Sequence, residues 1–126
     1  MDDKINLIFY FVKHYLMRTL TPAEFTELTQ NDYYFLLFCC WTDCTKCKMQ
    51  EPVLESLEWE IQMPLYKIDC QEEQRAASRF DVTVLPTIIK MRWSEEEQRI
   101  EWEVQPKDYI LDFFRLWNVK LQESGE

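Results

Sequence analysis

The sequence has few basic residues and no long apolar run. Its 14 Lys and Arg residues stand against 23 Asp and Glu residues, and the net charge of −9 disfavours nucleic acid and anionic membranes as partners. The apolar stretch from Ile5 to Val12 is too short to span a bilayer. No small-residue cleavage site follows it, so we expect neither a membrane span nor a signal peptide.

Histidine is equally scarce, which argues against a metal centre. Cys44 and Cys47 could supply half of a zinc site, but no second C-x-x-C exists and the one histidine, His14, is far along the chain. We therefore expect no metal and no cofactor. An iron–sulfur cluster shared between two chains through Cys39 and Cys40 is the alternative.

The five cysteines do not resemble a disulfide scaffold. Cys39 and Cys40 are adjacent in a predicted strand, so their side chains point to opposite faces and cannot both reach one partner. Cys70 follows another predicted strand, where we expect an exposed thiol, either inert or regulatory. Unpaired cysteines suit a reducing compartment, so we expect a monomeric cytoplasmic protein.

One C-x-x-C motif, Cys44 to Cys47, stands where an apolar strand gives way to a helix. Residues 33–40 are apolar enough for a buried strand, and apolar residues recur at helical spacing from Met49 to Ile61. The helix N-terminus would stabilise a thiolate at Cys44, and Cys47 lies one turn further in. The motif predicts thiol–disulfide exchange, in which Cys44 attacks and Cys47 resolves the mixed disulfide.

Together with further residues, this motif resembles the thioredoxin superfamily. Lys48 follows Cys47 directly, and Pro52 comes five residues after Cys47. Further along, Leu85-Pro86-Thr87 leads into an apolar strand. The resemblance covers about residues 17–117. It implies that Pro52 kinks the helix and that the bond before Pro86 is cis, with this proline against the cysteines.

The resemblance implies an α/β thioredoxin fold, in which helices flank a central mixed sheet of four to five strands, with an extra N-terminal helix. One domain is expected over residues 1–126, with its core at about 17–117, a helical extension at 1–16 and a loose tail at 122–126. Turn and helix-start residues, together with the periodicity of apolar residues, predict strands at 33–40, 64–69, 87–93 and 99–104. They predict helices at 22–29, 44–62, 72–80 and 106–117. The family order is β-α-β-α-β-α-β-β-α.

Three finer expectations concern single residues in these elements. Thr21 and Glu24 form a capping box at the start of the first core helix. Trp102 alternates with charged residues in the last strand, so it should face the core, and Tyr109 should lie on the inner side of the last helix. The run Glu95-Glu96-Glu97 should be a solvated hairpin turn.

Some positions depart from the superfamily's pattern. The family's buried Asp, which assists the resolving cysteine, would stand at Phe38, so resolution should be slower or use water. The only glycine is Gly125. Val84 replaces the glycine before the proline step, and Glu103 replaces the glycine that faces the cysteines. A bulkier and more acidic substrate groove should follow, unless Glu103 merely pairs across the hairpin.

Opposite charges surround the two sulfurs. Lys46 and Lys48 are the only bases between residues 19 and 66, against eight carboxylates, and they should favour the thiolate. Asp43 opposes that effect, and the residues between the cysteines are Thr45-Lys46 rather than Gly-Pro. The sequence therefore leaves open whether these charges make the Cys44–Cys47 couple more oxidising or more reducing.

We predict a thiol–disulfide oxidoreductase that acts on protein disulfides and is recycled by a reductase or another electron donor. Besides the two cysteines, Pro86 shapes the groove and the backbone of Leu85 binds extended substrate as an added strand. The alternative is a thioredoxin-like interaction module with little turnover. The missing acid, the missing glycines and the extra helix favour the module, whereas the intact C-x-x-C argues against it.

Overall fold

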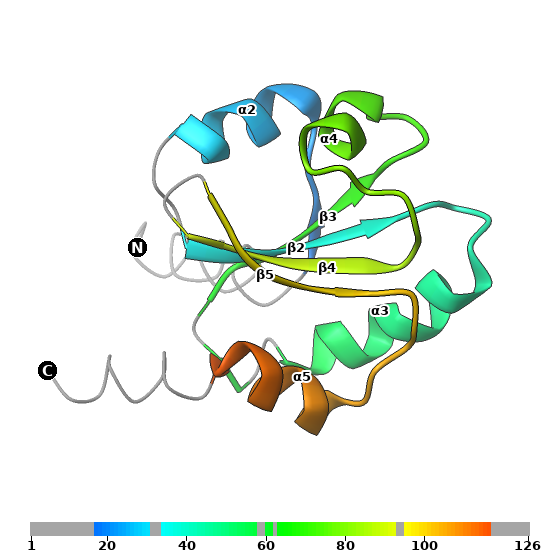
Figure 1. Cartoon of the computed structure of the whole chain (residues 1–126), viewed down its shortest axis with the longest axis vertical. Coiled ribbons are helices and arrows are strands. Elements are labelled where there is room, and N and C mark those ends of the chain that lie inside the picture. The colour runs from blue at the N-terminus through cyan, green and yellow to red at the C-terminus, as the bar shows by residue number, and fades with distance from the viewer. Residues whose placement is uncertain (1–16, 31–33, 58–59, 62, 93–94, 117–126) are drawn as a thin grey trace, which may run out of the picture.

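Five strands form one sheet with helices on both of its faces (Figure 1). This computed structural model describes residues 17–30, 34–57, 60–61, 63–92 and 95–116. The elements are β1 (Arg18–Thr19), α2 (Pro22–Gln30), β2 (Tyr34–Cys40), α3 (Thr45–Leu57), β3 (Leu65–Asp69), α4 (Gln74–Arg79), β4 (Thr87–Arg92), β5 (Glu95–Glu101) and α5 (Lys107–Phe114). Both the order of these elements and the mixed α/β fold are as predicted.

The central strand, β2, accounts for this arrangement. It carries no charged residue, and every side chain from Phe35 to Cys40 is buried. A strand that is apolar on both faces needs cover on both faces, which the helices provide. The strand order is β1-β3-β2-β4-β5; β1, β3 and β2 run parallel, whereas β4 is antiparallel to β2 and β5 is antiparallel to β4.

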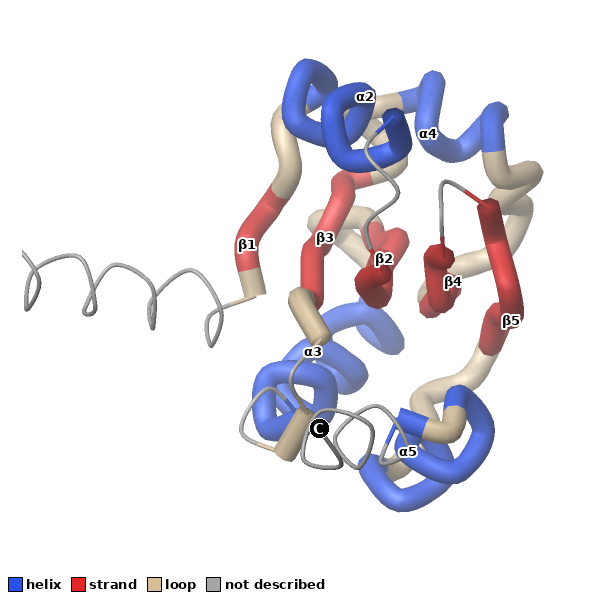
Figure 2. The backbone as a smooth tube through the Cα atoms, turned by 90° about the vertical axis from the view of Figure 1, so that its left-hand side faces the viewer, coloured by secondary structure: helices blue, strands red, loops and turns tan. Residues whose placement is uncertain are grey.

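The sheet separates two apolar clusters. Helices α2 and α4 cover one face and α3 and α5 cover the other (Figure 2). Phe38 and Cys40 belong to the cluster on the α3 and α5 side, whereas Phe35 and Cys39 belong to the cluster on the α2 and α4 side. The predicted opposite orientation of Cys39 and Cys40 is therefore confirmed.

The predicted boundaries of the last strand are wrong. Strand β5 covers Glu95–Glu101 rather than 99–104, so the glutamate run begins a strand and is not a turn. The acidic segment joins the sheet because Glu97 pairs with Lys90 at 3.0 Å and with Arg92 at 3.5 Å. Trp102 consequently lies beyond the strand and is 60% exposed instead of buried.

Other expectations at the ends of elements had mixed outcomes. Helix α3 is described over Thr45–Leu57, and Glu60 and Ile61 are not helical, so the predicted end near residue 62 is wrong. Tyr109 is exposed rather than inward-facing. The capping box is confirmed, because the Thr21 N–H donates to Glu24 Oε1 at 3.0 Å and the Glu24 N–H donates to Thr21 Oγ1 at 3.2 Å. The expected helix at 1–16 and the tail at 122–126 lie outside the described residues.

Gln50 ties helix α3 to the chain between β5 and α5. Its fully buried side chain donates from Nε2 to the Gln105 carbonyl at 3.1 Å and accepts at Oε1 from the Gln105 N–H at 2.7 Å. One amide thus satisfies both backbone groups of Gln105, which would otherwise lose their partners. The position of α3 relative to the last strand depends on this pair of bonds.

Replacing Gln50 by Ala should lower the free energy of unfolding by about 1–3 kcal/mol, because two backbone groups lose their partners and a buried volume is emptied. Urea denaturation followed by tryptophan fluorescence measures this change. Glu55→Ala, at an exposed position of the same helix, is the control and should stay within about 0.5 kcal/mol of the parent. Equal stability of the two variants would contradict the structural importance of Gln50.

Candidate active site

Cys44 and Cys47 form a disulfide at the start of helix α3, with their Cα atoms 5.1 Å apart. The buried strand β2 delivers the chain to this point, and a short turn follows in which the Cys44 N–H donates to the Trp41 carbonyl at 3.2 Å. Thr42 Oγ1 donates to Asp69 Oδ2 at 3.0 Å and anchors the turn to the end of β3. The motif therefore rests on two neighbouring strands.

The two sulfurs have different surroundings. Cys47 is only 2% exposed, whereas Cys44 is partly exposed. The Cys47 N–H donates to Cys44 Sγ at 3.1 Å. This donor belongs to the first turn of α3, where unpaired N–H groups favour negative charge. After reduction, the same N–H would stabilise a thiolate on Cys44.

Residues far apart in the sequence meet at Cys44. The Leu85–Pro86 peptide bond is cis, and Leu85, Trp41 and Cys44 line one cavity of about 300 Å³. The rest of the lining comprises Cys70, Ala77, Val82 and Thr83. The predicted proline step thus lies beside the motif, on the side of the more exposed sulfur.

Trp102 connects the proline step with the motif. Its N–H donates to the Pro86 carbonyl at 3.0 Å, and its own carbonyl accepts from Lys46 Nζ at 3.4 Å. Its φ of 85° is in the region that favours glycine. Trp102, the neighbour of Glu103, therefore has the backbone conformation that suits glycine and the contact with Pro86.

A second cavity of about 350 Å³ lies at Cys47. Lys67 Nζ and Glu51 Oε2 are 3.0 Å apart in its wall. The other lining residues are Thr19, Cys40, Trp41, Thr42, Lys48, Asp69 and Glu72. Phe38, at the position of the missing acid, is fully buried in the apolar cluster that also contains Cys47.

The remaining predicted site residues spread over the surface around the motif. Asp43 and Thr45 are exposed in the turn and in the first turn of α3. Lys46 and Lys48 diverge, since Lys46 reaches the Trp102 carbonyl and Lys48 lines the cavity at Cys47. Glu103 is exposed just after β5, and its N–H donates to the Glu101 carbonyl at 3.1 Å.

Sequence analysis missed three contributors to the site. Trp102 was placed in the core because its alternation with charged residues extended a strand that in fact ends at Glu101. Cys70 was expected to be exposed, yet it is 5% exposed and lines the cavity at Cys44. The Glu51–Lys67 pair joins a helix to a strand, and no sequence signal could have revealed it.

The described residues contain no group of three or more His, Cys, Asp or Glu side chains placed to hold a metal ion. Among the described helices, none is both long enough and apolar enough to cross a membrane.

Comparison with known proteins gives consistent relatives. The family model described as Thioredoxin matches residues 16–115. A thioredoxin of Staphylococcus haemolyticus is 30% identical over 95 residues, which are 74% of this chain and 89% of the relative. Thioredoxin-related transmembrane protein 1 of Homo sapiens is 29% identical over 97 residues, and the match spans 75% of this chain but 34% of that protein.

Solved structures show the same likeness in three dimensions. A mutant thioredoxin from Halobacterium salinarum superposes with a TM-score of 0.69 at 25% identity, covering 80% of this chain and 88% of that one. Thioredoxin from Trypanosoma brucei brucei has a TM-score of 0.69 at 18% identity, covering 81% of this chain and 94% of that one. The second likeness concerns the fold alone.

Cys40 should resist alkylation in the native reduced protein, although it lines the cavity at Cys47. Burial raises the pKa of the Cys40 thiol to about 12, so it stays protonated and unreactive at pH 8.5. Cys44 should react first at this pH. Iodoacetamide labelling followed by peptide mass spectrometry measures both rates, with the urea-unfolded protein as the control in which Cys40 becomes reactive. Equal labelling of Cys40 and Cys44 in the native protein would contradict this assignment.

Proposed function

Because this chain belongs to the thioredoxin family, we propose that it is a thiol–disulfide oxidoreductase that exchanges its Cys44–Cys47 pair with disulfides of protein substrates. The observation that carries the proposal is the disulfide between a partly exposed and a buried cysteine at a helix N-terminus. An accessible sulfur can attack a client, and a buried one next to it can attack only that first sulfur.

In the reducing direction, the Cys44 thiolate attacks one sulfur of a client disulfide. A mixed Cys44–client disulfide forms, and the second client sulfur leaves as a thiolate and takes up a proton from solvent. Cys47 then loses its proton and attacks Cys44 Sγ, which re-forms the Cys44–Cys47 bond and releases the reduced client. The Cys47 N–H stabilises the thiolate of Cys44 at the start of this cycle.

Resolution by Cys47 is proposed to be the slow step. Phe38 provides no carboxylate behind this sulfur and is fully buried. The proton of Cys47 therefore passes to water in the adjoining cavity, which is polar and bordered by the Glu51–Lys67 pair. A slow step here lengthens the life of the mixed disulfide.

Clients are proposed to bind beside the proline step as an added strand. The backbone of Leu85 lies next to Pro86 and lines the cavity at Cys44, where it can bond extended client backbone. Trp41, which lines the cavity at Cys44, is 46% exposed, and Trp102, whose carbonyl accepts from Lys46, is 60% exposed, so both offer apolar contact area. The carboxylates of Asp43 and Glu103 are exposed, and we propose that they border the same groove.

We further propose a monomer in the cytoplasm that a reductase or another electron donor recycles. The described cysteines outside the motif, Cys39, Cys40 and Cys70, are free thiols, which suits a reducing compartment. The chain spans about a third of the transmembrane relatives that it matches, so substrates and partners of those longer proteins are not assumed for it.

Insulin reduction with dithiothreitol tests the proposed activity. Cys44→Ser should abolish catalysis because the nucleophile is lost, whereas Cys47→Ser should accumulate mixed disulfides that gel electrophoresis without reductant detects. Cys40→Ala, which removes a thiol outside the exchanging pair, is the matched control and should retain the parent's rate.

The outcome also separates the two function classes. A parent protein no faster than Cys44→Ser, with both folded by circular dichroism, would reject the oxidoreductase and leave the interaction module. Turnover well above that variant, together with trapped clients in Cys47→Ser, would support the enzyme.

Glu103 is proposed to disfavour acidic clients, mainly by slowing encounter. Two matched disulfide peptides, one flanked by Lys and one by Asp, provide the test. The Lys peptide should react about two- to threefold faster than the Asp peptide at low salt, and high salt should bring this ratio of rates closer to one. Glu103→Gln should also narrow it, whereas Glu55→Gln on the exposed side of α3 should not. A ratio insensitive to both salt and Glu103→Gln would remove Glu103 from the groove.

A further inference from the structure

Cys39 and Cys70 form a buried pair of thiols outside the motif. In the parallel ladder of β2 and β3, Cys39 is opposite Ile68, and Cys70 is two residues further along, so both side chains lie on the α2 and α4 face of the sheet. They are 1% and 5% exposed. The Cys70 N–H donates to the Cys40 carbonyl at 2.9 Å and fixes the chain at this point.

The two side chains are hydrogen-bonded to each other. This bond raises the pKa of Cys39 and lowers the pKa of Cys70. Negative charge is thus favoured on Cys70 rather than on Cys39. Cys70 is a diagonal neighbour of Cys39 in the ladder, with Cα atoms about 7–8 Å apart, so a disulfide between them requires a shift of the backbone as well as of the side chains. The pair has the unequal partners that a redox-active dithiol needs, one nucleophile and one resolving thiol.

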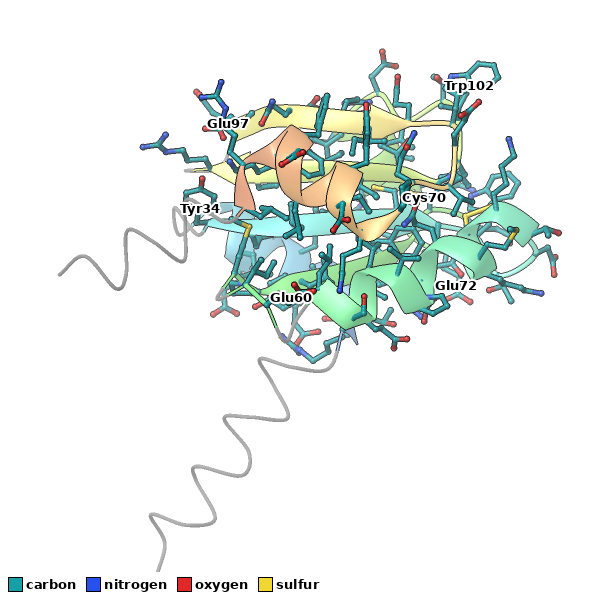
Figure 3. The ribbon with its side chains drawn as sticks, turned by 90° about the horizontal axis from the view of Figure 1, so that it is seen from below. Tyr34, Glu60, Cys70, Glu72, Glu97 and Trp102 are labelled. Carbon is teal, nitrogen blue, oxygen red and sulfur yellow. A yellow bond between two sulfur atoms is a disulfide. The ribbon has the colours of Figure 1, made fainter. Side chains whose placement is uncertain are left out.

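Cys70 also lies next to the active-site nucleophile. It lines the cavity of about 300 Å³ that Cys44 lines, together with Leu85 and Trp41. Figure 3 shows Cys70 at the end of the sheet where the disulfide and Trp102 lie. Cys70 thus shares a cavity with Cys44, whereas Cys47 and Cys40 line the other cavity.

We propose that Cys39 and Cys70 are a second redox-active dithiol, which exchanges electrons with the active-site disulfide through Cys70 and Cys44. The proposal rests on the proposed exchange activity of Cys44 and Cys47. It makes the chain a carrier of two electron pairs rather than one, so that one recharged molecule can reduce two client disulfides.

The exchange balances within the chain. The Cys70 thiolate attacks Cys44 Sγ of the oxidised motif; the Cys44–Cys47 bond breaks, and Cys47 leaves as a thiolate. The Cys39 thiolate then attacks Cys70 Sγ, which forms the Cys39–Cys70 disulfide and releases Cys44. The protons from Cys39 and Cys70 end on Cys44 and Cys47. Two electrons pass from the second pair to the first, and the client disulfide is the original oxidant.

Cys40 is a natural control because it is adjacent to Cys39 but lies on the other face of the sheet. It belongs to the cluster on the α3 side and borders the cavity at Cys47. Its thiol donates to the Ile68 carbonyl at 3.6 Å rather than to another sulfur. Exchange through Cys70 therefore predicts that oxidation joins Cys39 to Cys70 in a disulfide, whereas the neighbouring Cys40 stays a free thiol.

The test starts from fully reduced protein and adds excess oxidised glutathione under anaerobic conditions. Samples are quenched with acid, alkylated under denaturing conditions and mapped without reduction by mass spectrometry. The parent should acquire the Cys44–Cys47 and Cys39–Cys70 disulfides and leave Cys40 alkylated. Cys40→Ala should give the same two disulfides. Cys39→Ala and Cys39→Ser should lack the second one, with a folding check by circular dichroism.

Two further variants test the route of the electrons. Cys44→Ala should form the Cys39–Cys70 disulfide at least about tenfold more slowly than the parent, because Cys70 then lacks its exchange partner. The double variant Cys39→Ala/Cys47→Ala lacks both thiols that can break a Cys44–Cys70 disulfide, so it should accumulate this disulfide on oxidation. Formation of Cys39–Cys70 at the parent's rate in Cys44→Ala would overturn the exchange.

The proposal and the proposed function fail in different ways. A parent that forms Cys44–Cys47 and reduces insulin, yet keeps Cys39, Cys40 and Cys70 alkylatable, would overturn the second dithiol and leave the oxidoreductase standing. A parent that neither forms Cys44–Cys47 nor reduces insulin would overturn the proposed function itself.

Discussion

The burial of strand β2 on both faces is the constraint on which the rest of the structure depends. Tyr34–Cys40 can be covered only by placing β3 and β4 beside it and helices above and below it. β2 is the central strand of the sheet, and the chain that leaves its C-terminal end enters α3 after a short turn. The motif is thereby held at a helix N-terminus, where the Cys47 N–H donates to the Cys44 sulfur.

The same sheet sorts the five sulfurs. Cys40 and Cys47 belong to the cluster under α3 and α5, and Cys39 and Cys70 belong to the cluster under α2 and α4. Cys44 packs against the first cluster and lines a cavity together with Cys70. A strand alternates its side chains, so adjacent cysteines cannot share an environment. Burial leaves the Cys40 thiol inert with a pKa of about 12, whereas a hydrogen bond lowers the pKa of Cys70.

Charge complements this arrangement at the end of the sheet distant from the motif. Lys90 is buried on β4, yet its ammonium group pairs with Glu97 at 3.0 Å and donates to the Phe114 carbonyl at 2.7 Å. One cation thus holds β5 to β4 and binds the C-terminal end of α5. A buried ammonium is tolerated when it is paired and hydrogen-bonded in this way. The acidic composition is consequently part of the fold and not simply a solvated surface.

Local patterns in the sequence determined the elements and the pair of sulfurs. The apolar run at 34–40, the helical spacing after Cys47 and the capping box of Thr21 and Glu24 depend on neighbouring residues, so they could be read before the structure was known. Tertiary structure alone decided the ends of β5, the exposure of Trp102 and the burial of Cys70. The reason is that Glu97 pairs with cations on another strand, that the Trp102 N–H donates to the Pro86 carbonyl, and that Cys70 packs in the same buried cluster as Cys39. Spacing along the chain carries no information about such partners.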